Sequence, residues 1–495
     1  MKDRRSEEKR NSEKKFRSTT LNQEGSKLKI NREISRITFF FAALFFAMIV
    51  YFVVFEVKDA KTVIKNPANG RNATTKEDVS RGKILSSSGH TLAVTKTDKD
   101  GNEYRSYPYK NLFAHVVGVS SYGSSGLELA FNNQLMTSNV SLKEKVKNEA
   151  NGDKNPGNSI VTTLDMKLTK AAYDAFGDYD GAFVAMDAES GEILSMLSKP
   201  DYNPNELLKD YESVTSGEDS VLLNRATQGK YTPGSIFKTI TTLAYMDQGF
   251  DLDEFTYRCK GSLSFDTKDN YKISCFDGEA HGYENLENAF AYSCNGAYAT
   301  IGQTLDVTSF QSLCEKLLFN RDLPLDLEWK KSSISLSKDS NLFDVTQTAI
   351  GQGTTQVTPI HMCMLASAIA NDGVLMTPYL VSQVVNENGE TLKTYSPKKY
   401  KDMMTSSQAE TLQDFMEATV EYGTAKSLNS SIYKAAGKTG TAELDKNDNV
   451  NSWFIGYFTM EDRKIAVACV LENLPAGGKT ATNVLKTTFD TYASQ

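Results

Sequence analysis

The chain has 495 residues, 40% hydrophobic and 24% charged, and this composition argues against a fully disordered, a collagen-like or a many-span membrane protein. At about 150 residues per domain, the length allows roughly two to three domains. The net charge is −7, yet residues 1–36 hold twelve Lys and Arg against six Asp and Glu, so a basic tail precedes an acidic body. Because binding to nucleic acid requires basic residues that neutralise phosphates, we expect no nucleic-acid partner.

Residues 1–36 are rich in Lys, Arg, Glu, Ser and Asn without a sustained apolar period, so we expect a disordered tail. Residues 37–55 are uncharged and nearly all apolar, enough for a helix of about 28 Å. We therefore predict a transmembrane helix at 37–57. The preceding basic residues predict a cytoplasmic N-terminus and an external body. A cleaved signal peptide is the alternative, but its apolar core would be shorter and followed by small residues.

Residues 58–157 alternate short apolar runs with polar turns and lack a long helical period. This pattern predicts a small mixed or β-rich module outside the membrane. The turn-forming run 151–157 predicts a linker at its end. A module of this size is too short to hold a second sizeable catalytic domain.

Residues 158–495 are expected to form the second external domain. Its hairpins joined to a block of helices predict the α+β class rather than a doubly wound parallel sheet. The expected elements are a strand at 159–165, a helix at 166–176, two strands within 181–197, an apolar helix at 235–250, an amphipathic helix at 407–420, two strands within 452–472 and a helical tail.

All six cysteines lie in the predicted external part, where disulfides can persist. Cys259 and Cys275 flank a polar, hairpin-like stretch and form the best-placed pair for a disulfide. Isolated buried thiols are the alternative, because spacing alone does not establish connectivity. The four histidines belong to no H-E-x-x-H motif, and no paired C-x-x-C spacing is present, so we expect no metal and no cofactor.

The sharpest chemical signal is a Ser-x-x-Lys motif at Ser235 and Lys238. It follows Pro233-Gly234 and precedes an apolar helical run, which places both side chains on one helical face. A serine nucleophile needs a base, and a lysine can serve when burial or a nearby cation lowers its pKa. The spacing recurs at seven other serines, including Ser431, so the motif alone proves little. An ordinary helix start with a solvent-exposed lysine is the alternative.

Two further motifs follow in order. Ser293 and Asn295 flank Cys294, an arrangement that can direct a hydroxyl and an amide to one side while the thiol turns inward. The run 438–441, Lys438-Thr439-Gly440-Thr441, falls on an expected strand, where small residues admit a substrate backbone and the Lys and Thr side chains can bind an anion. A helix cap and an exposed strand pair are the alternatives. Three motifs in this order within one predicted domain indicate an active site.

With these motifs the chain resembles the penicillin-binding proteins, the serine transpeptidases of the bacterial cell wall, which share the S-x-x-K, S-x-N and K-T-G set. The stretches GEILSMLSKPDYNPN, LLNRATQGKYTPGSIFK and AIGQGTTQVTPIHMCMLASAIANDG extend the resemblance over about 158–495. From Arg81, RGKILSSSGHTLA resembles the start of the class B pedestal module, with Ser86-Ser87 where that family has Asp-Arg. The resemblance implies the penicillin-binding transpeptidase fold, an antiparallel sheet flanked by helices with a helical subdomain.

The resemblance also implies a mechanism. Ser235 would attack the carbonyl of the penultimate D-Ala of a peptidoglycan stem peptide, with Lys238 as base, to form an acyl-enzyme. An amine of a neighbouring stem peptide would then take the acyl group and complete the cross-link. β-Lactams would acylate the same serine, and a membrane glycosyltransferase partner would supply the glycan polymer.

The other motif residues receive supporting roles from the resemblance. Ser293 and Lys438 would relay a proton to the leaving amine, and Asn295 would hold the peptide amide. Thr439 and Thr441 would bind the terminal carboxylate beside Gly440. The backbone N–H groups of Ser235 and Thr441 would form the oxyanion hole.

Several alternative functions stay open. A bifunctional glycosyltransferase–transpeptidase is disfavoured by the short segment at 58–157, and a class A β-lactamase by the lack of an E-x-x-L-N stretch. A β-lactam sensor shares the acylation chemistry, and a D,D-carboxypeptidase differs only in that water takes the acyl group. A non-catalytic scaffold of a wall-synthesis complex is disfavoured by the intact motifs.

Overall fold

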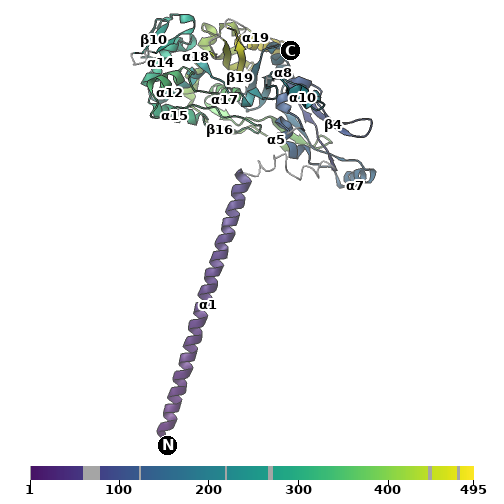
Figure 1. Cartoon of the computed structure of the whole chain (residues 1–495), viewed down its shortest axis with the longest axis vertical. Coiled ribbons are helices and arrows are strands. Elements are labelled where there is room, and N and C mark those ends of the chain that lie inside the picture. Colours follow the sequence, from purple (N-terminus) through teal and green to yellow (C-terminus); the bar gives the residue numbers. More distant parts are fainter. Residues whose placement is uncertain are drawn as a thin grey trace. The chain divides into compact units, whose positions relative to one another are not determined.

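The structure is a computed structural model that describes residues 2–58, 78–121, 124–217, 220–265, 271–443, 449–475 and 480–495 (Figure 1). The chain divides into two compact units, residues 1–70 and 71–495.

The described part of the first unit is one long helix, α1 (Lys2–Lys58), drawn in purple in Figure 1. Its stretch Ile34–Glu56, of 23 residues, is long and apolar enough to cross a membrane. The structure differs from the expected disordered tail at 1–36, because the described residues there continue the same helix. No proline interrupts this segment, and its many Lys, Arg, Glu and Gln residues are good helix formers.

A five-stranded antiparallel sheet forms the centre of the second unit, in the order β17-β18-β19-β7-β8. Its strands include the hairpins expected from the sequence: β7 (Gly181–Asp187), β8 (Ile193–Lys199), β17 (Lys434–Glu443), β18 (Val450–Met460) and β19 (Arg463–Leu474). Side chains alternate between the two faces, so Phe454 and Phe458 enter one hydrophobic core while Trp453 and Ile455 enter the other.

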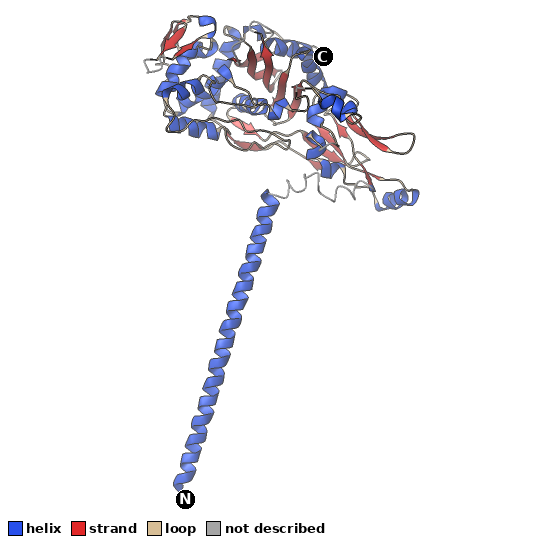
Figure 2. Ribbon diagram, viewed as in Figure 1, coloured by secondary structure: helices blue, strands red, loops and turns tan. Residues whose placement is uncertain are grey.

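Helices cover both faces of this sheet (Figure 2). On the Phe454 face lie α8 (Met166–Phe176) and α19 (Ala481–Ala493), and on the other lies α17 (Pro359–Ala370), whose residues are all buried. Asp165 caps α8 by accepting from the backbone N–H groups of Lys167 and Leu168, which ends the preceding extended segment. The predicted α+β class, with an antiparallel sheet flanked by helices, is confirmed.

The helical subdomain beside the sheet carries two of the three motifs. Its helices are η2 (Gly234–Phe237), α12 (Lys238–Asp247), α13 (Leu286–Ala291), α14 (Asn295–Thr304), α15 (Val307–Lys316), α16 (Leu342–Ala349) and α18 (Ser406–Glu421). Short paired strands accompany them: β9 (Tyr257–Cys259) with β12 (Gly282–Glu284), β10 (Ser262–Ser264) with β11 (Lys272–Ser274), and β13 (Val374–Met376) with β16 (Lys399–Asp402). Short helical turns are η3 (Phe276–Gly278), η4 (Lys426–Leu428), α9 (Pro204–Leu207), α10 (Tyr211–Thr215) and α11 (Arg225–Gln228).

A six-stranded sheet, in the order β15-β14-β6-β2-β3-β4, underlies the pedestal module. It joins β2 (Ile84–Leu85), β3 (Thr91–Thr97) and β4 (Glu103–Ser106) to β6 (Ser159–Thr162), β14 (Val381–Val385) and β15 (Thr391–Thr394). Around it lie β1 (Val79–Ser80), β5 (Asn155–Pro156), η1 (Lys110–Phe113), α4 (Ala114–Val117), α5 (Gly126–Ala130), α6 (Asn132–Leu135) and α7 (Leu142–Asn151). This sheet takes strands from both sides of the predicted boundary at 157/158, so the chain returns to the pedestal after entering the second domain.

A buried ion cluster lies in this module. Glu128, fully buried, accepts from Arg81 Nε at 2.5 Å and from Arg105 Nε at 2.7 Å. Burial raises the pKa of the Glu128 carboxyl, but the two guanidinium groups more than offset it and hold that pKa below its usual value. The carboxylate is therefore kept charged inside the protein.

Candidate active site

Ser235 lies in η2, a single 3₁₀ turn that precedes α12, so the helix expected at 235–250 begins with a tighter turn. Gly234 precedes it with φ +56°, and a Cβ there would lie 2.4 Å from the carbonyl oxygen of Thr441. A Cβ on Gly440 would in turn lie 2.9 Å from the carbonyl oxygen of Pro233. These two glycines allow η2 to lie directly against β17, which brings the first and third motifs together.

Lys238 joins the first motif to the second. Its fully buried Nζ donates to the Ser293 carbonyl oxygen at 2.6 Å, to Ser293 Oγ at 3.1 Å and to Asn295 Oδ1 at 2.7 Å. All three acceptors are uncharged. Burial therefore lowers the pKa of Lys238 to about 8, which makes a neutral amine accessible near neutral pH.

Ser293 and Asn295 lie where α13 gives way to α14. Ser293 adopts φ +60°, a left-handed conformation that is uncommon for residues other than glycine. Cys294 lies between them at the N-cap of α14. Its side chain is fully buried, which agrees with the prediction that the thiol turns inward. Asn295 Nδ2 donates to the Ser274 carbonyl oxygen at 2.8 Å, so the amide is fixed on both sides.

The third motif lies on β17, an edge strand of the five-stranded sheet. Lys438 is fully buried, 5.6 Å from the ring centroid of Phe290, and donates to the Thr439 carbonyl oxygen at 3.1 Å. Burial, and then the charge of Lys238, hold the pKa of Lys438 well below its usual value. An edge strand can pair with an extended peptide, which suits a peptide substrate.

The hydroxyl-bearing residues of β17 differ in exposure. Thr439 is half-buried and its Oγ1 lies 2.5 Å from Thr424 Oγ1, whereas Thr441 is exposed. Sequence reasoning did not single out Thr424 or Phe290, because neither belongs to a motif. Only the packing of β17 against the helical subdomain shows their contacts with the motif residues.

The predicted Cys259–Cys275 disulfide stays a prediction. In the structure both residues are buried free thiols whose sulfur atoms lie 3.7 Å apart. The proximity expected from the hairpin-like stretch is therefore present.

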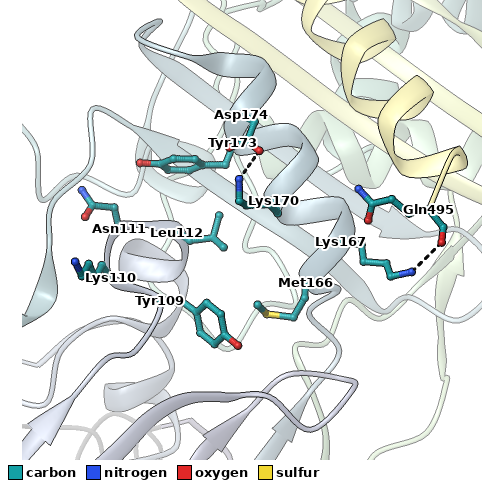
Figure 3. A pocket seen from close by; sticks show the side chains of 10 residues that line it. All are labelled: Tyr109, Lys110, Asn111, Leu112, Met166, Lys167, Lys170, Tyr173, Asp174 and Gln495. Atoms are coloured by element: carbon teal, nitrogen blue, oxygen red, sulfur yellow. Dashed lines mark hydrogen bonds and ion pairs between the residues drawn. The ribbon is translucent and has the colours of Figure 1, made fainter.

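A cavity of about 550 Å³ lies elsewhere, beside α8 and η1 (Figure 3). Tyr109, Leu112 and Met166 line it together with lysines, of which Lys170 pairs with Asp174. None of the residues of the three motifs lines this cavity.

Comparisons with known proteins agree with this geometry. Residues 181–490 match the family model described as the penicillin binding protein transpeptidase domain. The chain belongs to the penicillin-binding protein transpeptidase family. Residues 81–160 match the penicillin binding protein A dimerisation domain, which identifies this family member as class B.

Relatives of this penicillin-binding protein extend over most of its length. It is 29% identical over 471 residues to the peptidoglycan D,D-transpeptidase PbpA of Mycolicibacterium smegmatis, covering 90% of this chain and 94% of that relative. The crystal structure of the D,D-transpeptidase domain of a peptidoglycan glycosyltransferase from Eggerthella lenta has a TM-score of 0.74 at 30% identity, covering 83% of this chain and 97% of the other.

A second solved structure matches this penicillin-binding protein over a similar length. It is the imipenem acyl-enzyme complex of penicillin-binding protein A from M. tuberculosis, with a TM-score of 0.77 at 25% identity, covering 85% of this chain and 100% of the other. That relative is thus seen with a β-lactam bound covalently.

Proposed function

We propose that this penicillin-binding protein is a peptidoglycan D,D-transpeptidase that cross-links stem peptides through an acyl-enzyme on Ser235. The observation that carries the proposal is the buried Lys238 amine, held by Ser293 and Asn295 one helical turn after Ser235 and close to β17. The names of the PbpA relatives and the β-lactam acyl-enzyme of penicillin-binding protein A support it.

Acylation uses the lysine as base. Neutral Lys238 takes the proton of the Ser235 hydroxyl while Ser235 Oγ forms a bond to the carbonyl carbon of the penultimate D-Ala. The backbone N–H groups of Ser235 and Thr441 stabilise the oxyanion of the tetrahedral intermediate. The peptide C–N bond then breaks, the terminal D-Ala leaves as an amine with a proton relayed through Ser293 and Lys438, and an ester on Ser235 remains.

Deacylation reverses these proton transfers. The amine of a neighbouring stem peptide attacks the ester carbonyl, loses a proton to the site and forms the new amide bond, while Ser235 regains its proton. During the earlier acylation step, Asn295 holds the peptide amide of the donor stem peptide. Thr439 and Thr441 bind the terminal carboxylate of that donor beside Gly440. A β-lactam enters the same path, because its strained amide takes the place of the D-Ala–D-Ala bond.

We also infer that this protein is anchored in the cell membrane and works with a glycosyltransferase. Helix α1 would anchor the chain, with the basic residues before Ile34–Glu56 on the cytoplasmic side and the motif-bearing unit outside the cell. A membrane glycosyltransferase would supply the polymerised glycan strands that carry the stem peptides.

The test is the intact mass of the full chain in detergent after incubation with benzylpenicillin. Ser235→Ala is compared with the wild type and with Ser431→Ala, an exposed serine in a second Ser-x-x-Lys sequence. We expect one stable adduct on the wild type and on Ser431→Ala, and none on Ser235→Ala. An adduct on Ser235→Ala, or none on folded wild type, would contradict the proposal, and rapid turnover of the drug would indicate a β-lactamase.

A donor pentapeptide separates the transpeptidase from the carboxypeptidase. With D-alanine release as the readout, we expect an added amine acceptor to divert the acyl group into a cross-linked product. Release of D-alanine with only the hydrolysed tetrapeptide formed at saturating acceptor would assign the chain as a carboxypeptidase.

A further inference from the structure

Three thiols and an imidazole meet beside the second motif. One ligand atom from each of Cys259, Cys275, Cys294 and His281 lies within 4.8 Å of all the others. They come from four separate segments: the end of β9, the residue after β11, the N-cap of α14 and the residue before β12. β10, which lies between Cys259 and Cys275 in the chain, and α14, which begins after Cys294, lie together in the teal part of Figure 1.

The sulfur separations are those of a metal-thiolate site. Cys275 Sγ lies 3.7 Å from Cys259 Sγ and 3.9 Å from Cys294 Sγ. A tetrahedral zinc ion with Zn–S bonds of about 2.3 Å holds its sulfurs about 3.8 Å apart. A disulfide would hold a pair of sulfurs at about 2.05 Å.

The cluster is buried and leaves one of its own polar atoms without a partner. The three cysteines are buried, and Cys294 is fully so. Among the described residues, His281 Nδ1 is buried without a hydrogen-bond partner, and the Glu284 carboxyl is buried between it and the Cys294 thiol. Burying such atoms unpaired is costly. A cation at the cluster would offset that cost, and Glu284 Oε1, 3.8 Å from His281 Nδ1, could orient the imidazole.

We propose that Cys259, Cys275, Cys294 and His281 bind one zinc ion. Three sulfurs and one imidazole nitrogen form a complete tetrahedral set of the kind found in structural zinc sites. Zinc displaces the three thiol protons and forms three Zn–S bonds and one Zn–N bond, with no change of oxidation state. Because all four positions are filled by protein atoms, the ion has no open position for substrate and acts structurally.

The site is continuous with the second motif. Cys294 lies between Ser293 and Asn295, and Asn295 Nδ2 donates to the carbonyl of Ser274, the neighbour of Cys275. The turn in which Ser293 has φ +60° is held by Cys294 and by the Ser274 carbonyl next to Cys275. A zinc ion that joins Cys275 to Cys294 therefore fixes both of these points. The ligands form no short C-x-x-C pair, so the sequence gives no metal signal; the folding of β9–β12 against the start of α14 brings them together. The metal and the predicted Cys259–Cys275 disulfide would use the same sulfurs, so they exclude one another.

Metal content of the full chain tests the proposal without reference to its activity. The chain is purified in detergent with a thiol reductant, and zinc is counted by inductively coupled plasma mass spectrometry. We expect about one zinc per wild-type chain and per Cys314→Ala chain, a buried thiol outside the cluster. We expect less than about one tenth of that amount in Cys259→Ala and His281→Ala.

A second measurement on the unmodified chain avoids any dependence on how the variants fold. After zinc removal, Co²⁺ is added, and we expect the thiolate-to-cobalt charge-transfer band and the d–d bands of a tetrahedral site at one equivalent. The proposal is overturned if the reduced wild type retains no zinc and gives no such bands. It is also overturned if zinc remains at full occupancy in the Cys259→Ala, Cys275→Ala double variant, or if metal-free protein carries a Cys259–Cys275 disulfide that persists under the purification reductant.

Discussion

Two regions of this molecule each bury an ionisable side chain, but burial has opposite effects on whether that side chain keeps its charge. In the pedestal, Glu128 contacts two guanidinium groups and keeps its charge. At the active site, Lys238 meets a carbonyl, a hydroxyl and an amide, none of which is charged. Burial acts on both groups, but their partners decide the outcome. Glu128 stays charged in an ion pair, whereas the pKa of Lys238 is lowered.

The difference separates a structural use of burial from a chemical one. A paired buried ion has little freedom to change its protonation, so it is suited to fixing geometry. A buried lysine with neutral partners can lose and regain a proton near neutral pH, which is what a general base requires.

Removing the Lys238 amine should have the largest effect. In Lys238→Ala the second-order rate constant for acylation by a fluorescent penicillin is expected to fall about 10³-fold, since general-base catalysis contributes about 10²- to 10⁴-fold. Lys238→Arg should be similarly slow because a guanidinium does not give up its proton. The control is Lys434→Ala, an exposed lysine on β17. An acylation rate within twofold of wild type in Lys238→Ala would refute its role as base.

Breaking the pedestal cluster should lower the stability of the protein and leave the acylation rate of the folded molecules unchanged. Glu128→Gln leaves the buried Arg105 and the part-buried Arg81 guanidinium groups without their counter-charge, at a cost of about 3 kcal/mol in the free energy of unfolding. Thermal unfolding of the full chain checks this, with the more exposed ion-pair residue Glu103 as control, since Glu103→Gln should cost less than about 1 kcal/mol. The acylation rate per folded molecule should stay at the wild-type level. A wild-type melting temperature for Glu128→Gln would show that the cluster is not structural.

The pH profile of acylation should follow the proton of Lys238. Since its pKa is lowered to about 8, the active neutral amine is the minor form at pH 7 and becomes the major form above pH 8. The acylation rate constant is then expected to be about tenfold lower at pH 7 than at its plateau. Rates measured from pH 6 to pH 9.5, corrected for hydrolysis of the free drug, check this. A profile that stays flat, or falls through pH 8, would contradict a lysine base.

Removing zinc should have the smallest effect on the chemistry. Chelation is expected to slow acylation measurably but by less than about tenfold, because the metal orients Ser293 and Asn295 without contacting substrate. Adding back Zn²⁺ should restore the rate, and Mg²⁺ should not. Cys314→Ala, which keeps all four proposed ligands, should respond to chelation and to added Zn²⁺ as the wild type does. If the acylation rate does not change when zinc is fully removed, the metal does not position the second motif.

Much of the fold could be predicted because its signals are local. Helix α8 and the hairpin β18–β19 follow from hydrophobic spacing within a few residues. The 3₁₀ turn at η2 could not, since it depends on contacts of Gly234 with Thr441 and Gly351, which lie more than a hundred residues away. The helical state of residues 2–36 was also missed, because the segment has no apolar periodicity from which a helix could be expected.

The sequence by itself determined the order of the three motifs, the apolar stretch of α1 and the α+β class, since each depends on residue types and short spacings. Only the tertiary structure decided that Lys238 and Lys438 are both fully buried, and that the charge of Lys238 is close enough to lower the pKa of Lys438. It also decided that four residues between Cys259 and Cys294 share one small volume. Burial, electrostatic interaction and metal geometry depend on distances in space, and these arise only when segments far apart in the chain pack together.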